Sequence, residues 1–378
     1  MACESLYIWQ GSTAKFPVWD SPLTWDGTLS RAQGNASNRI VRAIRAKEKE
    51  LLVWAVCGAG KTEMLFTGIE AALQLGLRIC IATPRADVVR ELKPRVQQAF
   101  QSVAIQALYG GSEEKEGTAQ IIISTTHQLL RYYKTFDVMI IDEVDAFPYH
   151  NDSALPFAVR RAGKDGHTTI YLTATPRNNL RYRIAINKLP HIFVPTRFHG
   201  YPLPVPTLQI LYSLKKKLKQ QVIPTPLISW INERKNPSRQ VLIFVPTISL
   251  ASELVKSLYD RLKSDPMYVK NTCIESVHSE DEKRIEKITR FRNNEIKILI
   301  TTSILERGVT FPSVDVMVLH ANHSVFDEAA LVQIAGRAGR SADDPDGEVV
   351  FFHDGKSMAM VKAVRSIKRM NRRGGFKS

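Results

Sequence analysis

The sequence predicts an α/β protein made of two doubly wound domains in tandem, and three observations support this prediction. The chain has 378 residues, which is about two and a half times a typical domain of roughly 150 residues. In both halves, short apolar runs alternate with segments whose apolar residues recur every three or four positions, as is typical of parallel strands joined by crossover helices. Hydrophobic residues make up 44% and charged residues 24% of the chain, which excludes disordered, collagen-like and coiled-coil proteins.

Ten apolar runs, each four to six residues long and together rich in Val and Ile, are the predicted strands. Continuous runs of this kind are what parallel strands require when helices cover both faces of the sheet. In the first half the runs are LLVWAV (51–56), RICIAT (78–83), IIIS (121–124), VMIID (138–142) and TIYLT (169–173). In the second half they are VLIFV (241–245), CIESV (273–277), IKILIT (296–301), VDVMVL (314–319) and GEVVFF (347–352).

A proline-rich segment marks the boundary between the two domains. Five prolines lie between positions 190 and 206, and proline interrupts both β-ladders and helices. We therefore expect a linker near 190–210, an N-terminal domain of residues 1–200 and a C-terminal domain of residues 201–378.

The charge balance indicates a polyanionic partner. The formal net charge is +15, and the last seventeen residues (362–378) contain seven basic and no acidic side chains. Such a surplus favours nucleic acid or an anionic membrane face as partner. The alternative is a solvated basic surface that ends in a mobile basic tail.

Several features favour a reduced, cytoplasmic protein. No run approaches the ~18 apolar residues of a spanning helix, and the first ten residues do not resemble a secretory signal. The cysteines (Cys3, Cys57, Cys80 and Cys273) form no C-x-x-C pair, so no local zinc or redox motif is expected.

A phosphate-binding loop is predicted where the strand at 51–56 meets the next helical segment. The sequence AVCGAGKTE (55–63) is a relaxed Walker A motif, because Ala55 stands where the usual pattern has Gly. Small residues let backbone N–H groups converge on phosphates at a helix N-terminus. The Lys61 side chain would reach the outer phosphates and the Thr62 hydroxyl would bind Mg²⁺. The expected ATP-binding residues are therefore Gly58, Ala59, Gly60, Lys61 and Thr62.

Two acids at the carboxyl end of the strand at 138–142 are expected to complete this site. Asp142 would hold Mg²⁺ together with Thr62, because Mg²⁺ prefers oxygen ligands. Glu143 would orient and deprotonate the attacking water.

The order of the motifs resembles that of superfamily 2 helicases. Residues 142–145 (DEVD) resemble the DEAD/DEAH box, residues 173–175 (TAT) the S/T-A-T motif and residues 333–340 (QIAGRAGR) the Q-x-x-G-R-x-G-R motif. The resemblance implies two tandem RecA-like P-loop NTPase domains with ATP and Mg²⁺ as cofactors. Thr173, Ala174 and Thr175 would couple the sites. Gln333, Arg337 and Arg340 would be catalytic and Gly308 would contact the nucleotide.

The two arginines are expected on one side of a helix, because they are three positions apart. Their planar forks suit phosphate oxygens. Gln33, ahead of the first helical segment, resembles the glutamine that reads adenine in this superfamily.

The resemblance also implies a nucleic-acid track along strand ends in both domains. Hydroxyls, backbone N–H groups and an arginine suit phosphate contacts that do not read bases. The His127 ring suits base stacking and, equally, a hydrogen-bonded structural role. The residues implied are Pro84, Arg85, Thr125, Thr126, His127, Thr247, Thr301 and Thr302.

Within superfamily 2 the chain resembles the ComFA family of late-competence ATPases. The resemblance is carried by LYIW (6–9), VWAVCGAGKTEMLF (53–66), residues 124–149 and LERGVTF (305–311). Members usually carry a four-cysteine zinc module near the N-terminus, but Cys3 is the one cysteine near the start of this chain, so we expect no zinc.

The resemblance implies an ATPase that moves on single-stranded DNA (ssDNA) and draws it into the cytoplasm during natural competence. It also implies ComFC and DprA as partners and peripheral contact with the membrane DNA-uptake channel. The alternatives are an RNA or DNA helicase of PriA/RecG-like type, since the 2′-hydroxyl is what distinguishes RNA, and an ATP-gated DNA clamp. The sequence leaves the oligomeric state open.

Overall fold

The computed structural model describes residues 14–114, 117–263 and 273–377. The chain divides into two compact units, Met1–Gly200 and Tyr201–Ser378. Two sequence features, Cys3 and the LYIW segment (6–9), lie outside the described residues.

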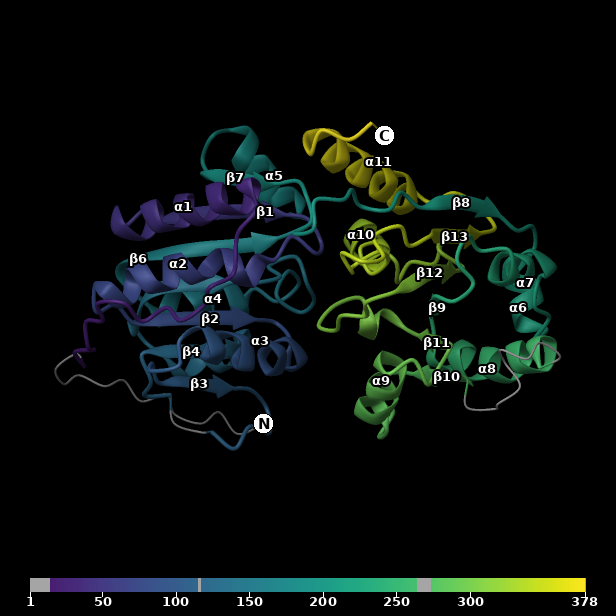
Figure 1. Cartoon of the computed structure of the whole chain (residues 1–378), viewed down its shortest axis with the longest axis horizontal. Coiled ribbons are helices and arrows are strands. Elements are labelled where there is room, and N and C mark those ends of the chain that lie inside the picture. Colours follow the sequence, from purple (N-terminus) through teal and green to yellow (C-terminus); the bar gives the residue numbers. More distant parts are fainter. Residues whose placement is uncertain (1–13, 115–116, 264–272, 378) are drawn as a thin grey trace. The chain divides into compact units, whose positions relative to one another are not determined.

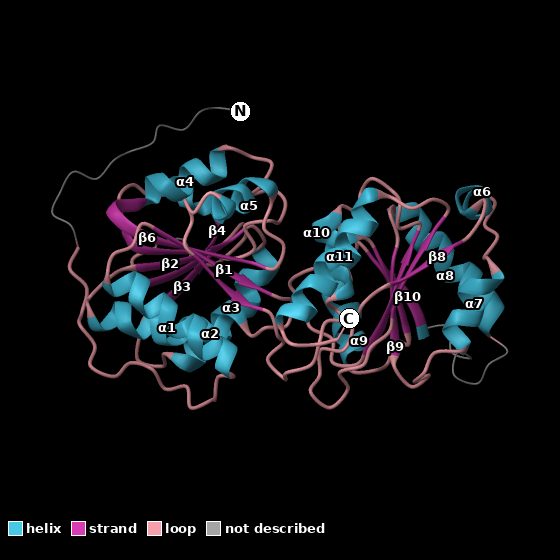
Figure 2. Ribbon diagram, turned by 90° about the horizontal axis from the view of Figure 1, so that it is seen from above, coloured by secondary structure: helices cyan, strands magenta, loops and turns pink. Residues whose placement is uncertain are grey.

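The first unit is a parallel sheet in the order β3-β4-β2-β5-β6-β1-β7. Helices α4 and α5 cover one face, and α1, α2 and α3 cover the other (Figure 2). The strands are β1 (Glu50–Ala55), β2 (Ile79–Thr83), β3 (Ile105–Leu108), β4 (Ile121–Thr125), β5 (Phe136–Ile141), β6 (Gly163–Thr173) and β7 (His191–Val194). The helices are α1 (Arg31–Arg45), α2 (Lys61–Gln74), α3 (Ala86–Ala99), the 3₁₀ helix η1 (Thr126–Arg131), α4 (Ala154–Ala162) and α5 (Asn178–Ala185).

The second unit is a parallel sheet in the order β10-β11-β9-β12-β13-β8. Helices α10 and α11 cover one face, and α6, α7 and α8 cover the other (Figure 2). The strands are β8 (Thr207–Ile210), β9 (Gln240–Phe244), β10 (Ile274–Val277), β11 (Ile298–Thr301), β12 (Val314–Leu319) and β13 (Val349–His353). The helices are α6 (Leu214–Lys219), α7 (Thr225–Asn232), α8 (Ile248–Leu262), α9 (Arg284–Arg292), the 3₁₀ helix η4 (Ser303–Leu305), α10 (Glu328–Ala335) and α11 (Met358–Arg373).

The ten predicted strands are confirmed, and the doubly wound α/β prediction with them (Figure 1). The strands β2, β4 and β9 are buried along their whole length, which explains their continuous apolar runs, since helices cover both faces.

Strands β3, β7 and β8 are not among the predicted strands, and all three are edge strands of four residues. The segment 190–210, in which the sequence places the linker, contains β7 at its start and β8 at its end, and the boundary between the two units lies between these strands. Pro190 and Pro195 flank β7, and Pro206 immediately precedes β8. Proline is tolerated at strand ends and on sheet edges, where the missing N–H breaks no ladder.

Most of the basic C-terminal segment (362–378) belongs to helix α11, so the alternative of a mobile tail is wrong. The buried residues of this helix, Met360, Ala363, Ile367 and Met370, recur at helical spacing, so one face packs into the second unit while the basic residues line the other. Of the described helices, none has both the length and the apolar composition needed to cross a bilayer.

Candidate active site and nucleic-acid interface

The predicted phosphate loop of the first unit lies between β1 and α2. Gly58 and Gly60 have positive φ angles of 78° and 67°, which are costly for side chains with a Cβ. Gly60 is the N-cap of α2, and Lys61 is the first residue of that helix. Ala55, the departure from the usual Walker A pattern, is the buried last residue of β1. Strand geometry accommodates its methyl group, so the departure leaves the loop intact.

Lys61 and Asp142 face each other at the end of β5. Lys61 Nζ lies 3.9 Å from Asp142 Oδ1, and the Glu143 N–H donates to the same oxygen at 2.8 Å. Burial raises the pKa of the Asp142 carboxyl to about 6, and the Glu143 charge adds to this increase while the Lys61 ammonium opposes it. A bound cation would stabilise the ionised Asp142 carboxylate and so offset the free-energy cost of burying its charge.

The donor set fits Mg²⁺ with ATP. The Thr62 hydroxyl and the Asp142 carboxylate are hard oxygen ligands, and Lys61 supplies the cation for the outer phosphates. Glu143 has a left-handed backbone (φ 55°), a conformation that costs energy in residues other than Gly and is enriched at active sites. No group of three or more His, Cys, Asp or Glu side chains is placed to hold a metal ion within residues 14–114, 117–263 and 273–377.

Asp145 connects the acidic turn to the end of β6. Its carboxylate is fully buried and accepts hydrogen bonds from Thr173 Oγ1 at 2.6 Å and from Thr175 Oγ1. Its carbonyl oxygen accepts from Arg177 Nε at 3.2 Å and Nη2 at 3.0 Å. The sequence analysis placed Thr173, Ala174 and Thr175 at this point but assigned no role to Asp145 or Arg177. Asp145, the third acid of the DEVD motif, was the sequence feature that could have indicated this connection.

Gln33 lies on α1 rather than ahead of it. Its side chain takes part in a capping box with Ser30, and Nε2 donates to the Ala59 carbonyl oxygen at 3.0 Å. The buried amide therefore joins the start of α1 to the phosphate loop.

In the second unit Arg337 and Arg340 do not share a helix, so this expectation is wrong. Helix α10 ends at Ala335 with Gly336 as its C-cap, and Gly339 has a positive φ of 61°. Gly336 still has a helical backbone (φ −66°), and the left-handed Gly339 turns the chain away after the helix has ended. Gln333 remains on α10 and is buried.

The two arginines have different surroundings. Arg337 is buried and donates to the carbonyl oxygens of Glu306 (3.0 Å) and Val309. Arg340 is partly exposed and donates to the Gly336 carbonyl oxygen at 3.0 Å. Arg337 therefore ties the 333–340 motif to the segment that contains Gly308, whose φ is 73°.

The nucleic-acid candidates of the first unit lie at adjacent strand ends. Strands β2 and β4 pair with Thr83 opposite Thr125, which places 84–85 beside 125–127. Arg85 is partly exposed and forms an ion pair with Asp87 at 3.5 Å. The His127 side chain is exposed, whereas Pro84, Thr125 and Thr126 are buried. Side-chain contacts to a polymer are thus available from Arg85 and His127.

The corresponding hydroxyls of the second unit are engaged locally. Thr247 is the N-cap of α8 and accepts from the Leu250 N–H at 3.3 Å. Thr301 is buried at the end of β11, and its hydroxyl donates to the Thr302 carbonyl oxygen at 3.2 Å. Strands β9 and β11 are neighbours, so Thr247 and Thr302 lie at adjacent strand ends.

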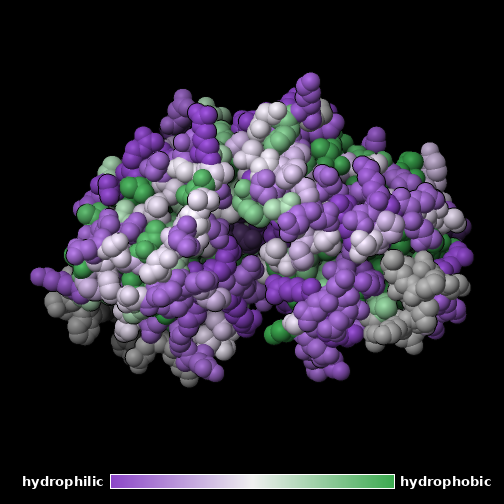
Figure 3. Space-filling model, viewed as in Figure 1, coloured by the Kyte–Doolittle hydropathy of each residue, from purple (hydrophilic) through white to green (hydrophobic). Residues whose placement is uncertain are grey.

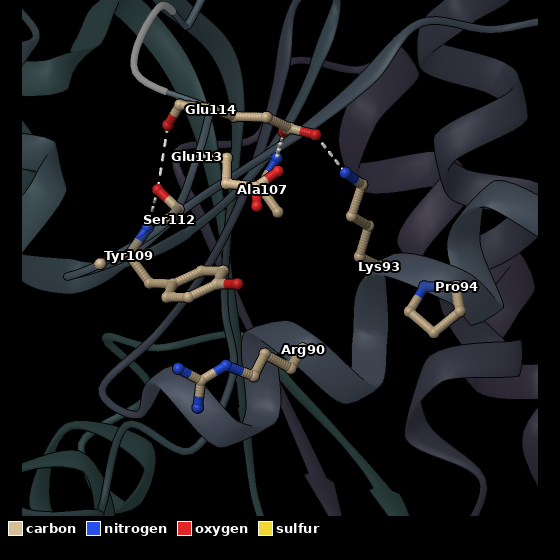
Figure 4. Close-up of a pocket in the computed structure, with 9 residues that line it drawn as sticks. Arg90, Lys93, Pro94, Ala107, Tyr109, Ser112, Glu113 and Glu114 are labelled. Atoms are coloured by element: carbon tan, nitrogen blue, oxygen red, sulfur yellow. Dashed lines mark hydrogen bonds and ion pairs between the residues drawn. The ribbon is translucent and has the colours of Figure 1, made fainter.

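A cavity of about 420 Å³ lies at the end of β3, the neighbour of β4. The Arg90 guanidinium lies 4.7 Å from the centroid of the Tyr109 ring, and Lys93 pairs with Glu114 across the cavity (Figure 4). Hydrophilic side chains cover most of the surface seen in Figure 3.

Two sequence families match the chain. The family described as "Type III restriction enzyme, res subunit" matches residues 26–178, and "Helicase conserved C-terminal domain" matches residues 219–342.

Two relatives and several solved structures are similar to most of the chain. Competence protein ComFA of Bacillus subtilis is 49% identical over 97% of this chain and 77% of its own length. ComFA of Streptococcus pneumoniae is 40% identical over 96% of this chain and 82% of its own length. Among solved structures, S. cerevisiae Dbp5 bound to RNA and ADP BeF3 has a TM-score of 0.63 at 18% identity, covering 91% of this chain and 88% of that one. Mycobacterium smegmatis helicase Lhr bound to ssDNA and AMP-PNP has a TM-score of 0.63 at 16% identity, covering 95% and 51%.

The relatives identify the family, and the structures show the fold. The superfamily 2 core implies the use of ATP and Mg²⁺, for which Lys61, Thr62 and Asp142 are suitably placed. This chain therefore belongs to the ComFA family of competence proteins and is a helicase-like ATPase with two RecA-like domains.

Proposed function

We propose that the protein is an ssDNA-stimulated, Mg²⁺-dependent ATPase that moves along ssDNA and drives its uptake into the cytoplasm during competence. The observation that carries this proposal is the pair of hydrogen bonds from Thr173 and Thr175 to Asp145. They link the acidic turn of the nucleotide site to a strand end of the same sheet. On the other side of β5, the Asp142 N–H donates to the Ala82 carbonyl oxygen at 2.8 Å, so the same turn also contacts the end of β2, which Arg85 follows.

Different residues of the first unit bind the phosphates, hold the cation and activate the attacking water. Lys61 and the N-terminus of α2 bind the phosphates, and Thr62 and Asp142 hold the cation. Bound Mg²⁺ supplies charge neutralisation on the phosphate oxygens. Glu143 holds the attacking water and accepts its proton. The family resemblance implies that Gln333, Arg337 and Arg340 take part in hydrolysis and that Gly308 contacts the nucleotide.

The choice of ssDNA rests on the family and on the type of contact available. The strand ends offer backbone groups, one arginine and one exposed ring, a combination that follows a phosphate chain without reading bases. Tyr109, beside Arg90 at the neighbouring strand end, adds an aromatic face. Of the similar structures, Lhr is bound to ssDNA and Dbp5 to RNA, so RNA is the competing polymer.

The test is a steady-state ATPase titration with ssDNA, duplex DNA and RNA of matched sequence. We expect the largest stimulation with ssDNA, and loss of turnover in Lys61→Ala and Glu143→Gln. Equal rates with and without DNA reject the proposal, and stronger stimulation by RNA reassigns the polymer. DNA affinity that depends on nucleotide without any turnover indicates a clamp.

We further propose a cytoplasmic protein in peripheral contact with the membrane DNA-uptake channel, with ComFC and DprA as partners. The support is the family resemblance. Co-purification of each partner with the tagged chain from competent cells, with and without nuclease, tests these contacts. Loss of both partners after nuclease treatment would mean that DNA alone joins them.

A further inference from the structure

The strand order fixes the direction in which a nucleotide lies on the first unit. The phosphate loop follows β1, and Asp142 follows β5, which lies beyond β6 on one side of β1. The contact between Lys61 and Asp142 draws the terminal phosphates toward β5. The nucleobase must then leave the loop on the opposite side, where β7 is the neighbour of β1.

The chain after β7 is attached to the phosphate loop on this side. The Val56 N–H donates to the Val194 carbonyl oxygen at 3.1 Å, and the Phe198 N–H donates to the Gly58 carbonyl oxygen at 2.9 Å. A Cβ added at Gly60 would lie 3.6 Å from Phe198 Cβ and 2.5 Å from Gln33 Nε2. Phe198 and the buried amide of Gln33 therefore border the same small space beside Gly60.

Phe198 is half exposed at this place. Its side chain is 50% exposed, and its ring makes an edge-to-face contact with His199 at a centroid distance of 4.9 Å. A surface phenylalanine needs no function by itself. Here, however, backbone hydrogen bonds hold the residue against the loop that binds the phosphates.

We propose that Phe198 supplies the aromatic face on which the nucleobase of ATP stacks, with Gln33 beside it at the polar edge of the base. The inference deepens the ATP site and does not depend on which polymer the protein follows. Stacking on an aromatic side chain is favourable for any base and strongest for the large purines, whereas Gln33 adds polar selectivity. The sequence analysis had no signal for Phe198, since TRFHG (196–200) matches no motif.

The test compares two ligands of the same site in the full-length protein: ADP, which has a base, and inorganic tripolyphosphate, which has none. Isothermal titration calorimetry measures both affinities for Phe198→Ala, Phe198→Tyr and the wild type. Phe157→Ala is the matched control, because Phe157 on α4 is 54% exposed. We expect Phe198→Ala to weaken ADP binding about tenfold, the usual effect of losing one stacked ring. Its tripolyphosphate affinity should stay within twofold, and Phe198→Tyr should bind ADP like the wild type.

Each other outcome overturns a specific claim. An unchanged ADP affinity in Phe198→Ala rejects the stacking role. An equal loss for ADP and tripolyphosphate assigns Phe198 to the shape of the phosphate loop instead, and so also rejects it. If the wild type binds neither ligand, the ATP site itself is wrong, and that failure is distinct from a polymer preference, which this experiment does not involve.

Discussion

The hydroxyl of Thr173 donates a hydrogen bond of 2.6 Å to Asp145, a fully buried carboxylate that also accepts one from Thr175. Asp145 shares a short turn with Asp142 and Glu143, while Thr173 is the last residue of β6 and Thr175 lies two residues beyond it. A buried carboxylate with two hydroxyl donors holds its partners firmly, because an unpaired one is costly. The acidic turn and the end of β6 therefore move as one piece.

We expect Thr175→Val to uncouple DNA binding from hydrolysis. It should lower the stimulation of ATPase by ssDNA about tenfold, within the usual range of coupling between sites, and leave the basal rate within about twofold. The first unit should also lose about 1.5–3 kcal/mol of stability, the value of one hydrogen bond to a charged group. Thr169→Val, a buried threonine of the same strand, is the control. A parallel fall of basal and stimulated rates would place the network in catalysis rather than coupling.

The raised pKa of Asp142 predicts that the stability of the nucleotide-free protein depends on pH. The folded protein holds this proton up to a pKa of about 6, against an ordinary value of 3.8. Stability of the nucleotide-free protein should therefore fall as the pH rises from about 4 to about 6, because the unfolded chain releases the proton first.

Asp142→Asn removes this dependence, so its Tm should exceed that of the wild type at pH 7.5 and match it near pH 4. Each kcal/mol corresponds to about 2–4 °C in a unit of this size. Thermal unfolding without nucleotide measures the effect, with Asp165→Asn as control, since Asp165 is 85% exposed. A Tm difference that is the same at both pH values would contradict the assignment.

The different surroundings of the two arginines predict different defects. Arg337→Ala removes donors from the Glu306 and Val309 carbonyl oxygens and should destabilise the second unit by several kcal/mol, since it leaves buried acceptors unpaired.

Arg340→Ala should instead lower turnover by about 10³ or more, as loss of an arginine finger does, with an unchanged Tm. Arg340→Lys should not restore turnover, because lysine lacks the planar fork. Arg292→Ala, an exposed arginine on α9, is the control. Normal turnover in a folded Arg340→Ala protein would remove this residue from the site.

The sequence predicted the central strands and the phosphate loop because their physical requirements are local. A strand buried on both faces needs an apolar run, and the loop needs small residues before Lys61. The strands β3, β7 and β8 were not predicted, because each has four residues and includes at least one polar side chain, so none forms a continuous apolar run.

Other features depend on contacts between distant segments. Asp145 meets Thr173 and Thr175 across two strands, and Phe198 meets the phosphate loop through hydrogen bonds of the backbone, which leave no trace in side-chain patterns. Arg337 and Arg340 have helical spacing, but helix α10 ends at Ala335, before both of them.

Helix α11 presents a row of basic side chains that should bind the phosphates of ssDNA. Lys362, Arg365, Arg369 and Arg372 recur at helical spacing and are exposed, while the apolar face of the helix is buried in the second unit. A membrane-surface helix inserts its apolar face, so the buried face favours nucleic acid as the polyanion.

Replacement of these four residues by Gln should flatten the slope of log K against log salt for ssDNA, by up to about 3 units at roughly 0.7 per phosphate. Substitution is a cleaner test than truncation, because truncation also removes the buried Ile367 and Met370. The matched control neutralises four exposed lysines of α6, namely Lys215, Lys216, Lys217 and Lys219. Fluorescence anisotropy at several salt concentrations gives the slopes. Equal slopes in the α11 variant and the wild type would show that the row does not contact ssDNA, and equal flattening in both variants would show that net charge alone sets the slope.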